Sequence, residues 1–319
     1  MKIARGLLLL SICTSFFPLT SCARGGGKTA PSPAEDASIS FTDDDGIRIN
    51  LPEKRSRIIS LYSAHTENLF AIGAGGALIG GHTTCTYPPE AASFAIYDYN
   101  GDPEYIIAAE PDLVLVRPFI RRRSPNYLAE IEMAGIPVVS LYAETLGDFD
   151  EYIRRLAQLT GTETEAEQQL ALFRRGLDQV RTVTGGITEK QIVFFESTEA
   201  EIRTAAEGSL PALAIEIAGG VNIASGALPV TRGSSIAPFG AEKLLQHADE
   251  IDVYIVQRGS MNSSTGTALA ARPGYHAIKA IQNNRVLYID EKQISSPTFR
   301  YLSGVQEIAR FLYPAHFSK

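Results

Sequence analysis

The sequence lacks several features that define whole classes of protein. Among 319 residues there are three cysteines and no tryptophan, so a framework of disulfides cannot be what stabilises the fold. Beyond the first 21 residues, no apolar run approaches the roughly 18–20 residues that a membrane-spanning helix requires. The net charge is −7, whereas proteins that bind nucleic acid need a basic surface. We therefore expect a globular protein with no nucleic-acid partner.

The sequence also lacks the common motifs of catalysis. No Gly-x-Gly-x-x-Gly follows the first predicted strand, and no Gly-x-Ser-x-Gly elbow, His-Glu-x-x-His pair or phosphate-binding loop occurs. Cys85 could act as a nucleophile or soft ligand, but an inert small residue is the favoured interpretation. We expect a protein that is not an enzyme and has no intrinsic cofactor. An extracytoplasmic α/β enzyme is the least favoured alternative.

Residues 1–21 have the layout of a secretory signal peptide. Lys2 and Arg5 precede an apolar core at residues 7–19, which is short for a membrane span. Small residues then lead directly to Cys22, an order that resembles the lipobox of bacterial lipoproteins. We predict that lipid on Cys22 anchors the protein to a membrane outside the cytoplasm, in the periplasm or at the cell surface. The alternative is an ordinary signal peptide followed by a chance cysteine.

Residues 22–38 are predicted to form a flexible tether. Glycine, alanine, proline and serine dominate the segment, a composition typical of linkers. A tether is useful only where one end is anchored, which supports lipidation of Cys22. Cys13 would leave with the signal peptide, so Cys85 would be the one free thiol and no intramolecular disulfide could form.

Residues 39–145 alternate short apolar segments with helical patterns, which predicts an N-terminal α/β lobe with a parallel sheet. Asp45-Gly46, between two short alternating segments, predicts a hairpin. Ser63 is predicted to cap the first helix. The predicted strands are 57–61, 78–80, 111–116 and 136–141, and the predicted helices are 64–72 and 127–134.

Residues 146–185 differ from this pattern. Apolar residues recur there at helical spacing, which predicts a connecting segment of one or two long helices with a break at Gly161. The α/β pattern resumes over residues 186–319 as a C-terminal lobe, with predicted strands 191–195, 252–256 and 285–289 and predicted helices 210–218, 241–248 and 302–313. The predicted fold class is therefore α/β, with two Rossmann-like lobes joined by a long helical backbone.

Five segments carry a resemblance to a known family. They are Asp45-Gly46 through Leu61, Glu67 to Ala74, Tyr87 to Ala91, Glu104 with the following Pro111-Asp112-Leu113-Val114, and Ala218 to Ala224. In this order they resemble the extracytoplasmic substrate-binding proteins of ABC importers for iron complexes, haem and vitamin B12 (the Fe/B12 periplasmic-binding domain family). The resemblance extends over residues 40–315.

The resemblance implies two lobes with a ligand cleft between them. It implies that a metal chelate (a ferric siderophore, haem or a corrinoid) binds in the cleft and is delivered to an ABC permease and its ATPase. We expect a monomer whose task is binding rather than chemistry. A tethered haem or metal carrier that works without a permease is the alternative.

Ligands of open parallel sheets bind outside the carboxyl ends of the strands. The segments that follow predicted strands are therefore candidates for the cleft: residues 62–65, 81–87, 117–119, 142, 196–198 and 257–261. Arg117 suits a carboxylate or a carboxylated chelate, and its alternative is a salt bridge to a neighbouring acid. Arg232 and Arg300, in loops rich in glycine, serine and proline, are further candidates.

His65 and His82 are candidates for contact with the ligand. His65 lies in the first turn of a helix, where the positive end of the helix disfavours an added proton. A neutral imidazole can coordinate a metal, so His65 is the tentative metal ligand. The alternative is a hydrogen-bonded structural histidine. His82 directly follows the second predicted strand.

Tyr62, Tyr87 and Tyr142 are the aromatic candidates, with Tyr97 and Tyr99 in the same lobe. An aromatic ring with a polar tip suits a large amphipathic chelate, and tyrosinate can ligate ferric haem iron. The alternative for each is half-buried packing. Some relatives that bind vitamin B12 use a cleft tryptophan, so the absence of tryptophan counts against a close copy of that site.

Glu104 and Glu242 are candidates for docking to the permease. In the family that the sequence resembles, one acidic residue at the outer tip of each lobe docks onto arginines of the permease. Glu104 matches by its spacing to Pro111-Asp112, and Glu242 by its place at the start of the helix before the strand at 252–256. The alternative is an ordinary acidic residue in a first helical turn, which the helix dipole favours.

Overall fold

The computed structural model describes residues 39–229, 231 and 234–317. The predicted signal peptide, the lipidation site Cys22, the tether and the predicted cleft residue Arg232 lie outside the described residues. Within the described part of the chain, no helix is both long and apolar enough to cross a bilayer.

The described chain begins with a hairpin, which confirms the prediction from Asp45-Gly46. It pairs β1 (Ile39–Thr42) with β2 (Arg48–Leu51), and Gly46 in the turn has a φ of 81°, a conformation that favours glycine. The carboxylate of Asp43 accepts the backbone N–H of Ile47 at 2.8 Å and that of Ser140 at 3.1 Å. One buried carboxylate therefore closes the turn and attaches it to the neighbouring sheet.

The first sheet is five-stranded and wholly parallel, in the order β5-β4-β3-β6-β7. Its strands are β3 (Ile58–Ser60), β4 (Leu78–Gly81), β5 (Ala95–Ile96), β6 (Leu113–Val116) and β7 (Val138–Ser140). Every residue of β3, β6 and β7 is buried, as expected for parallel strands covered on both faces. With α1 (Ser63–Ala71), α2 (Glu104–Ala108), α3 (Pro118–Arg123) and α4 (Pro125–Met133) it forms what we call the first lobe.

Ser63 does not cap α1, contrary to the prediction. Tyr62 occupies the N-cap position with extended backbone angles, and Ser63 is already the first helical residue. No side chain caps this end. The Tyr62 carbonyl accepts the N–H of His65 at 3.1 Å, so the first turn is closed by backbone alone.

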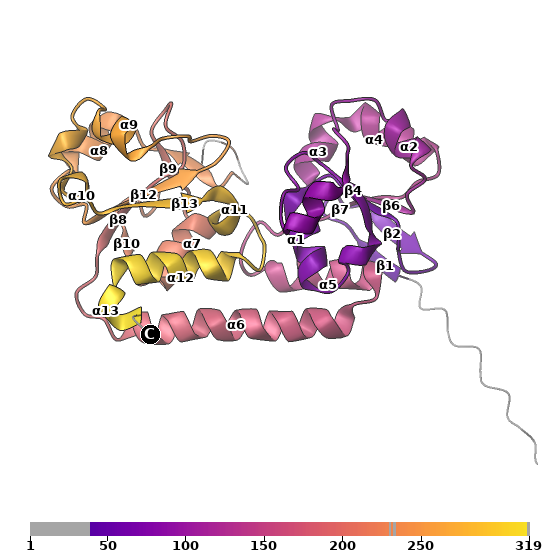
Figure 1. Ribbon diagram of the computed structural model, residues 1–319, viewed down its shortest axis with the longest axis horizontal. Coiled ribbons are helices and arrows are strands. Elements are labelled where there is room, and N and C mark those ends of the chain that lie inside the picture. The colour runs from indigo at the N-terminus through magenta and orange to yellow at the C-terminus, as the bar shows by residue number, and fades with distance from the viewer. Residues whose placement is uncertain (1–38, 230, 232–233, 318–319) are drawn as a thin grey trace, which may run out of the picture. The chain divides into compact units, whose positions relative to one another are not determined.

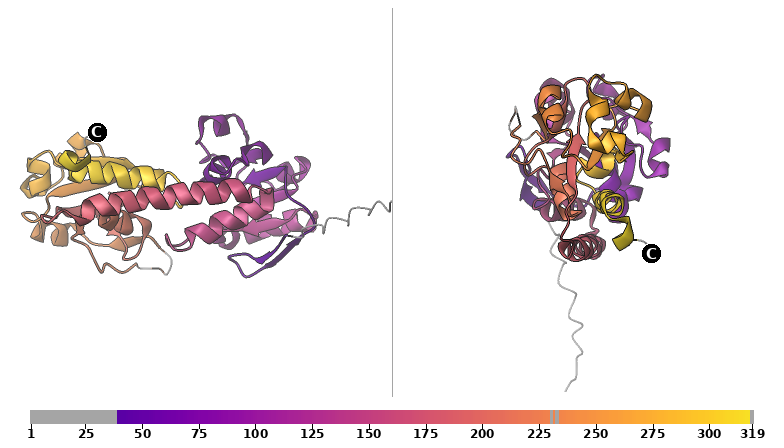
Figure 2. Two further views of the ribbon diagram at one scale, coloured as in Figure 1. Left: turned by 90° about the horizontal axis from the view of Figure 1, so that it is seen from below. Right: turned by 90° about the vertical axis from the view of Figure 1, so that its left-hand side faces the viewer.

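Two helices connect the lobes, α5 (Phe149–Thr160) and α6 (Glu163–Gly185). The predicted break at Gly161 is confirmed, because this residue ends α5 in a left-handed conformation with a φ of 76°. Figures 1 and 2 show α6 passing both sheets, with α5 beside one part of it and α12 (Tyr301–Leu312) beside the other.

The second sheet is also parallel, in the order β10-β8-β12-β13. Its strands are β8 (Ile192–Glu196), β10 (Val221–Asn222), β12 (Val253–Arg258) and β13 (Val286–Asp290), and a separate antiparallel pair joins β9 (Arg203–Ala205) to β11 (Ile236–Pro238). The helices are α7 (Leu210–Ile217), α8 (Ala241–Gln246), α9 (Gly266–Ala270), α10 (Lys279–Gln282), α11 (Glu291–Ile294), α12 and α13 (Pro314–Phe317). These elements form the second lobe, and the predicted α/β class is confirmed. Short 3-10 turns complete the chain at Gly75–Ala77 (η1), Pro89–Ser93 (η2) and Tyr275–Ala277 (η3).

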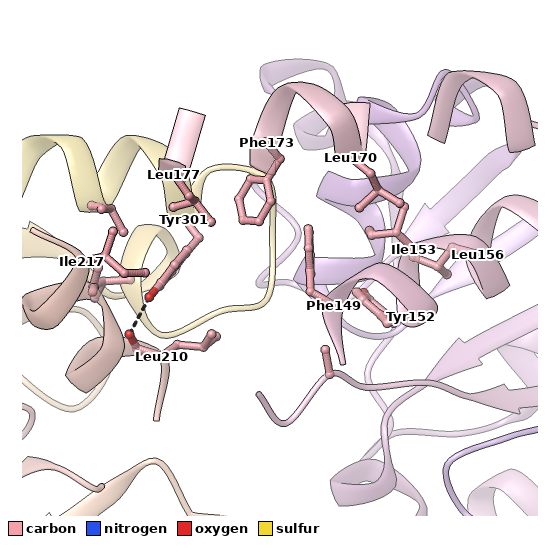
Figure 3. Packing of buried hydrophobic residues seen from close by; sticks show 14 of the residues in the cluster. Phe149, Tyr152, Ile153, Leu156, Leu170, Phe173, Leu177, Leu210, Ile217 and Tyr301 are labelled. Carbon is pink, nitrogen blue, oxygen red and sulfur yellow. Dashed lines mark hydrogen bonds between the residues drawn. The ribbon is translucent and has the colours of Figure 1, made fainter. Parts of the chain in front are cut away.

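One aromatic cluster joins the connecting helices to both lobes (Figure 3). The ring centroids of Phe149 on α5 and Phe173 on α6 lie 4.9 Å apart, and Phe299 lies 5.2 Å from the first and 5.7 Å from the second. Tyr301 at the start of α12 packs against Phe173 and donates its hydroxyl to the carbonyl of Leu210 at 2.8 Å. The described residues from Ile39 onward belong to one compact unit.

We expect this cluster to contribute a large part of the stability. Replacing the buried ring in Phe173→Ala should lower the free energy of unfolding by about 3–5 kcal/mol, because it removes a large apolar side chain and leaves a cavity. The neighbouring Leu172 is 53% exposed on the same helix, so Leu172→Ala should cost no more than about 0.5 kcal/mol. Urea denaturation of the two variants measures the difference. Equal losses would show that the cluster does not hold the lobes together.

Candidate functional site

A cavity of about 340 Å³ lies between the carboxyl ends of the two sheets. The first lobe contributes side chains that follow strands or begin the next helix: Leu61, Tyr62, Ser63, His82, Thr84, Tyr99, Arg117, Ile120 and Tyr142. The second lobe contributes Ser235, Ile236, Gln257, Ser260, Met261, Glu291, Lys292, Ser295 and Ser296. The cavity has the size and position of a small-molecule site.

Arg117 lies among aromatic rings in this cavity. It directly follows β6 and forms the N-cap of α3. Its guanidinium carbon is 4.6 Å from the ring centroid of Tyr62, 5.0 Å from that of Phe119 and 5.8 Å from that of Tyr142. Arg117 forms no ion pair with a carboxylate of the described residues, while its neighbour along the helix, Arg121, pairs with Asp45. The charge of Arg117 is thus held by ring faces and remains available to an anionic group.

Tyr62 and Tyr142 form one wall of the cavity, with ring centroids 6.1 Å apart. Burial, and then the neighbouring Tyr142, raises the pKa of Tyr62 above its ordinary value. Burial likewise raises the pKa of Tyr142, against the opposing effect of Arg117. Both side chains are therefore neutral phenols near pH 7.

His82 follows β4 and stacks on Tyr99, with ring centroids 4.9 Å apart and planes 20° from parallel. Its Nδ1 accepts the backbone N–H of Thr84 at 3.3 Å. The proton of the neutral ring is therefore on Nε2, which lies 3.9 Å from the carboxylate of Asp98. Burial lowers the pKa of His82, so the ring is neutral near pH 7.

His65, the tentative metal ligand, lies behind the cavity wall and is fully buried. Its Nε2 lies 2.9 Å from the Val116 carbonyl, which can only accept, so this nitrogen carries the proton. Its Nδ1 lies 2.8 Å from the Tyr152 hydroxyl and accepts from it. Both ring nitrogens are engaged, which favours the structural alternative over metal ligation. Nowhere in the described ranges do three His, Cys, Asp or Glu side chains gather as they would around a metal ion.

Tyr87 and Arg300, predicted for the cleft, do not line this cavity. They line a second one of about 470 Å³, where Arg300 makes a bidentate ion pair with Glu67 at 2.7 Å for each bond. The guanidinium carbon of Arg300 also lies 4.1 Å from the ring centroid of Tyr87. The physical reason is that Arg300 is the N-cap of α12, which brings it to the buried carboxylate of α1.

Among the cavity residues that lie outside the predicted segments, four come from the segment after the last strand, where the same position at a strand end points to the cleft. Glu291, Lys292, Ser295 and Ser296 all follow β13. Lys292 reaches the first lobe, where its ammonium donates to the carbonyl of Thr84 at 2.7 Å and to the hydroxyl of Thr86 at 3.0 Å. Conversely, the predicted segment 196–198 does not line the cavity, and Glu196 is fully buried.

A sequence model of the periplasmic binding protein family matches residues 58–293. The chain belongs to this family. It is 24% identical over 295 residues to an uncharacterised ABC transporter substrate-binding lipoprotein, YvrC, of Bacillus subtilis, covering 91% of this chain and 90% of that protein. It is 28% identical to a vitamin B12-binding protein of Vibrio campbellii, covering 79% of this chain and 87% of the relative.

Solved structures have the same fold. The periplasmic haem-binding protein RhuT from Roseiflexus, in its apo form, superposes with a TM-score of 0.69 at 24% identity, covering 82% of this chain and 99% of that one. A possible iron-binding periplasmic protein from Staphylococcus epidermidis gives the same score and identity, covering 82% and 100%. The relatives are named as binding proteins, in agreement with the expectation of a binding function.

The buried His65 predicts a specific loss of stability in acid. Burial lowers its pKa from the ordinary 6.5 to about 4, so the unfolded chain takes up a proton at a pH where the folded chain does not. Its contribution is complete above pH 6.5 and is lost as the pH falls toward 4. Between pH 7 and pH 4 the free energy of unfolding should fall by about 3 kcal/mol more in the native protein than in His65→Gln. Urea denaturation at both pH values measures this difference. Equal losses of unfolding free energy in the native protein and in His65→Gln would mean that the folded protein protonates His65 as readily as the unfolded chain does.

Proposed function

We propose that the protein is the extracytoplasmic substrate-binding lipoprotein of an ABC importer and that it carries a bulky metal chelate. The observation that carries the proposal is the cavity in which Arg117, free of any described carboxylate, lies among the rings of Tyr62, Phe119 and Tyr142. Flat aromatic surface around the positive charge of Arg117 suits an amphipathic organic ligand bearing an anionic or strongly polar group. Relatives named for vitamin B12, haem and iron support this class of ligand.

The hydrogen bonds of the cavity favour recognition of the organic periphery rather than of the metal. The Nδ1 of His82 accepts the backbone N–H of Thr84, while burial raises the pKa of Tyr62 and of Tyr142 and disfavours the tyrosinate forms that would ligate a metal. A chelate whose metal is already enclosed by its own ligands needs no side chain from this set. Hydroxyl, amide and charged groups around the cavity instead suit the polar edge of such a molecule.

Titration with three probes tests the ligand class. We expect saturable binding of at least one among cyanocobalamin, haemin and ferrichrome, followed by absorption spectroscopy or calorimetry. Arg117→Ala should weaken that binding by about tenfold or more, because a desolvated charged contact is lost. Arg123 is exposed on the same helix α3, and Arg123→Ala should leave the affinity unchanged. Absence of saturable binding for all three probes would contradict the proposed ligand class.

We further propose that Glu104 and Glu242 dock onto the permease. Each lies exposed in the first turn of a short helix, Glu104 on α2 and Glu242 on α8. Figure 1 shows these two helices on the side of the molecule away from α6, one in each lobe. Paired rim charges of this kind fix orientation and speed encounter with a partner of opposite charge. An anchor at Cys22 would hold the protein at the membrane, and the lipoprotein name of the Bacillus subtilis relative supports it.

Charge reversal tests the docking. The double variant Glu104→Lys/Glu242→Lys should bind its ligand as the native protein does but should abolish uptake of the labelled ligand by host cells. The control Glu165→Lys/Glu189→Lys makes the same change of charge at exposed positions in and just after α6, and it should leave uptake unchanged. Normal uptake by the first variant would mean that the ligand is carried without this permease contact.

A further inference from the structure

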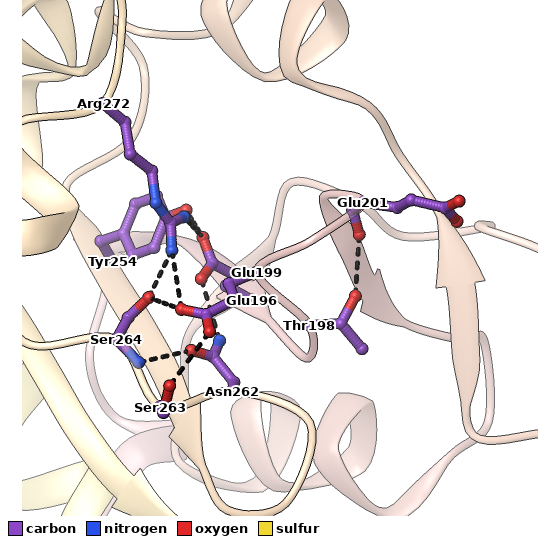
Figure 4. Close-up of polar contacts among 9 residues, drawn as sticks. All are labelled: Glu196, Thr198, Glu199, Glu201, Tyr254, Asn262, Ser263, Ser264 and Arg272. Atoms are coloured by element: carbon purple, nitrogen blue, oxygen red, sulfur yellow. Dashed lines mark hydrogen bonds and ion pairs between the residues drawn. The ribbon is translucent and has the colours of Figure 1, made fainter.

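A buried carboxylate lies next to the cleft without reaching it. Glu196 is the last residue of β8, is fully buried, and is absent from the cavity lining. Three donors from different segments converge on it (Figure 4). Asn262 donates its amide to Oε1 at 2.9 Å, Arg272 donates to Oε2 at 2.7 Å, and the Tyr254 hydroxyl makes a short hydrogen bond to the same oxygen. A buried charge is tolerated only with such compensation.

Asn262 is the last residue of a tight turn, residues 259–262, whose tip lines the cavity. The backbone N–H of Gly259 donates to the Asn262 carbonyl at 3.0 Å, so Ser260 and Met261 form the tip of a two-residue turn. Both tip residues line the cavity, and Met261 is 47% exposed, whereas Asn262 is buried. The tip is the part of the second lobe's β12 loop that faces the ligand.

The turn is held from two sides. On one side, Glu291 of α11 accepts the backbone N–H of Ser260 at 3.1 Å. A side chain at position 259 would overlap this carboxylate, because a Cβ on Gly259 would lie 2.0 Å from the Glu291 Cδ. On the other side, the amide of Asn262 reaches Glu196, and its Oδ1 accepts the N–H of Ser264 at 3.1 Å.

We infer that Glu196 is a positioning residue for ligand binding: through Asn262 it fixes the turn 259–262 so that Ser260 and Met261 face the ligand. The inference rests on the proposed function, because it takes the cavity as the ligand site. Glu196 itself touches no ligand. Its other partners, Arg272 and Tyr254, fix the carboxylate, so that Asn262 meets an acceptor whose position is already determined.

Both oxygens of the Glu196 carboxylate are needed as hydrogen-bond acceptors, so an amide of the same size cannot replace it. In Glu196→Gln, one carboxylate oxygen becomes an NH2 group. This NH2 group must face either the amide of Asn262 or the side of Arg272 and Tyr254. Arg272 and the amide of Asn262 are both donors, so one bond is lost in either orientation. Asn262 cannot compensate by exchanging its own oxygen and nitrogen, because its oxygen already accepts from Ser264. The orientation that keeps the stronger, charged bond to Arg272 turns the Gln NH2 group toward the Asn262 amide, so the substitution loosens the turn without changing the size of the side chain.

A single tryptophan can report on the turn without any ligand. The sequence has no tryptophan, so Met261→Trp places the single tryptophan of the protein at the tip of the turn. In this background, Glu196→Gln should lower the fluorescence anisotropy and increase quenching by acrylamide. Asn262→Ala removes the hydrogen bond between Asn262 and Glu196 and leaves the bond from Arg272 to Glu196 in place. It should change the anisotropy and the quenching in the same direction. It is the variant to use if Glu196→Gln does not fold. The control is Glu201→Gln, in the loop that follows β8. The Glu201 side chain is 74% exposed, and its substitution should change neither the anisotropy nor the quenching.

Binding is then measured with native Met261, using whichever of cyanocobalamin, haemin or ferrichrome binds the protein. Glu196→Gln and Asn262→Ala should raise Kd by about fivefold to tenfold, the equivalent of one lost hydrogen bond, mainly through faster dissociation. A folded variant with unchanged anisotropy and quenching overturns the inference, and so does a loosened turn with unchanged Kd. If the turn loosens but none of the probes binds the native protein, the proposed ligand class fails and the role of Glu196 in fixing the turn stands.

Discussion

The packing of aromatic rings between α5, α6 and α12 is the interaction on which the rest of the structure depends. The two sheets share no strand, and the walls of the cleft come from different sheets. Their spacing is therefore set by what lies beneath them, where Phe149, Phe173 and Tyr301 interlock. Packing of this kind fixes the spacing of the two walls, and a site that is shaped in advance has a lower ordering cost on binding.

The electrostatics of the cleft follow from burial as much as from composition. The protein as a whole is acidic, yet the described residues that line the cavity include two cations, Arg117 and Lys292, and one carboxylate, Glu291. The Glu291 carboxylate accepts the backbone N–H of Ser260. Burial keeps the tyrosines and His82 uncharged. The cleft therefore carries a local positive charge within a protein whose net charge is negative, which is complementary to a polar or anionic ligand.

Much of the fold could be predicted from the sequence, because buried parallel strands such as β6 are short continuous apolar runs and α5 and α6 have a clear helical period. The two-residue strands β5 and β10 could not be predicted, since they exist only where a neighbouring strand offers hydrogen-bonding groups. The rule of strand ends correctly brought Tyr62, Arg117 and Tyr142 to one cavity. It could not show that His65 would hydrogen-bond Tyr152, or that Arg300 would pair with Glu67 more than 200 residues away. These partners meet because α5 packs against α1 and because the N-terminal end of α12 lies beside α1.

The polar contacts of the segment after β13 limit how the cleft exchanges its contents. Within nine residues, Lys292 bonds to Thr84 and Thr86, the Pro297 carbonyl accepts from Asn68, and Arg300 pairs with Glu67. All of these bonds cross between the lobes, so separating the lobes would break them together rather than one at a time. The segment therefore acts as one strap along the edge of the cleft, separate from the aromatic packing beneath it.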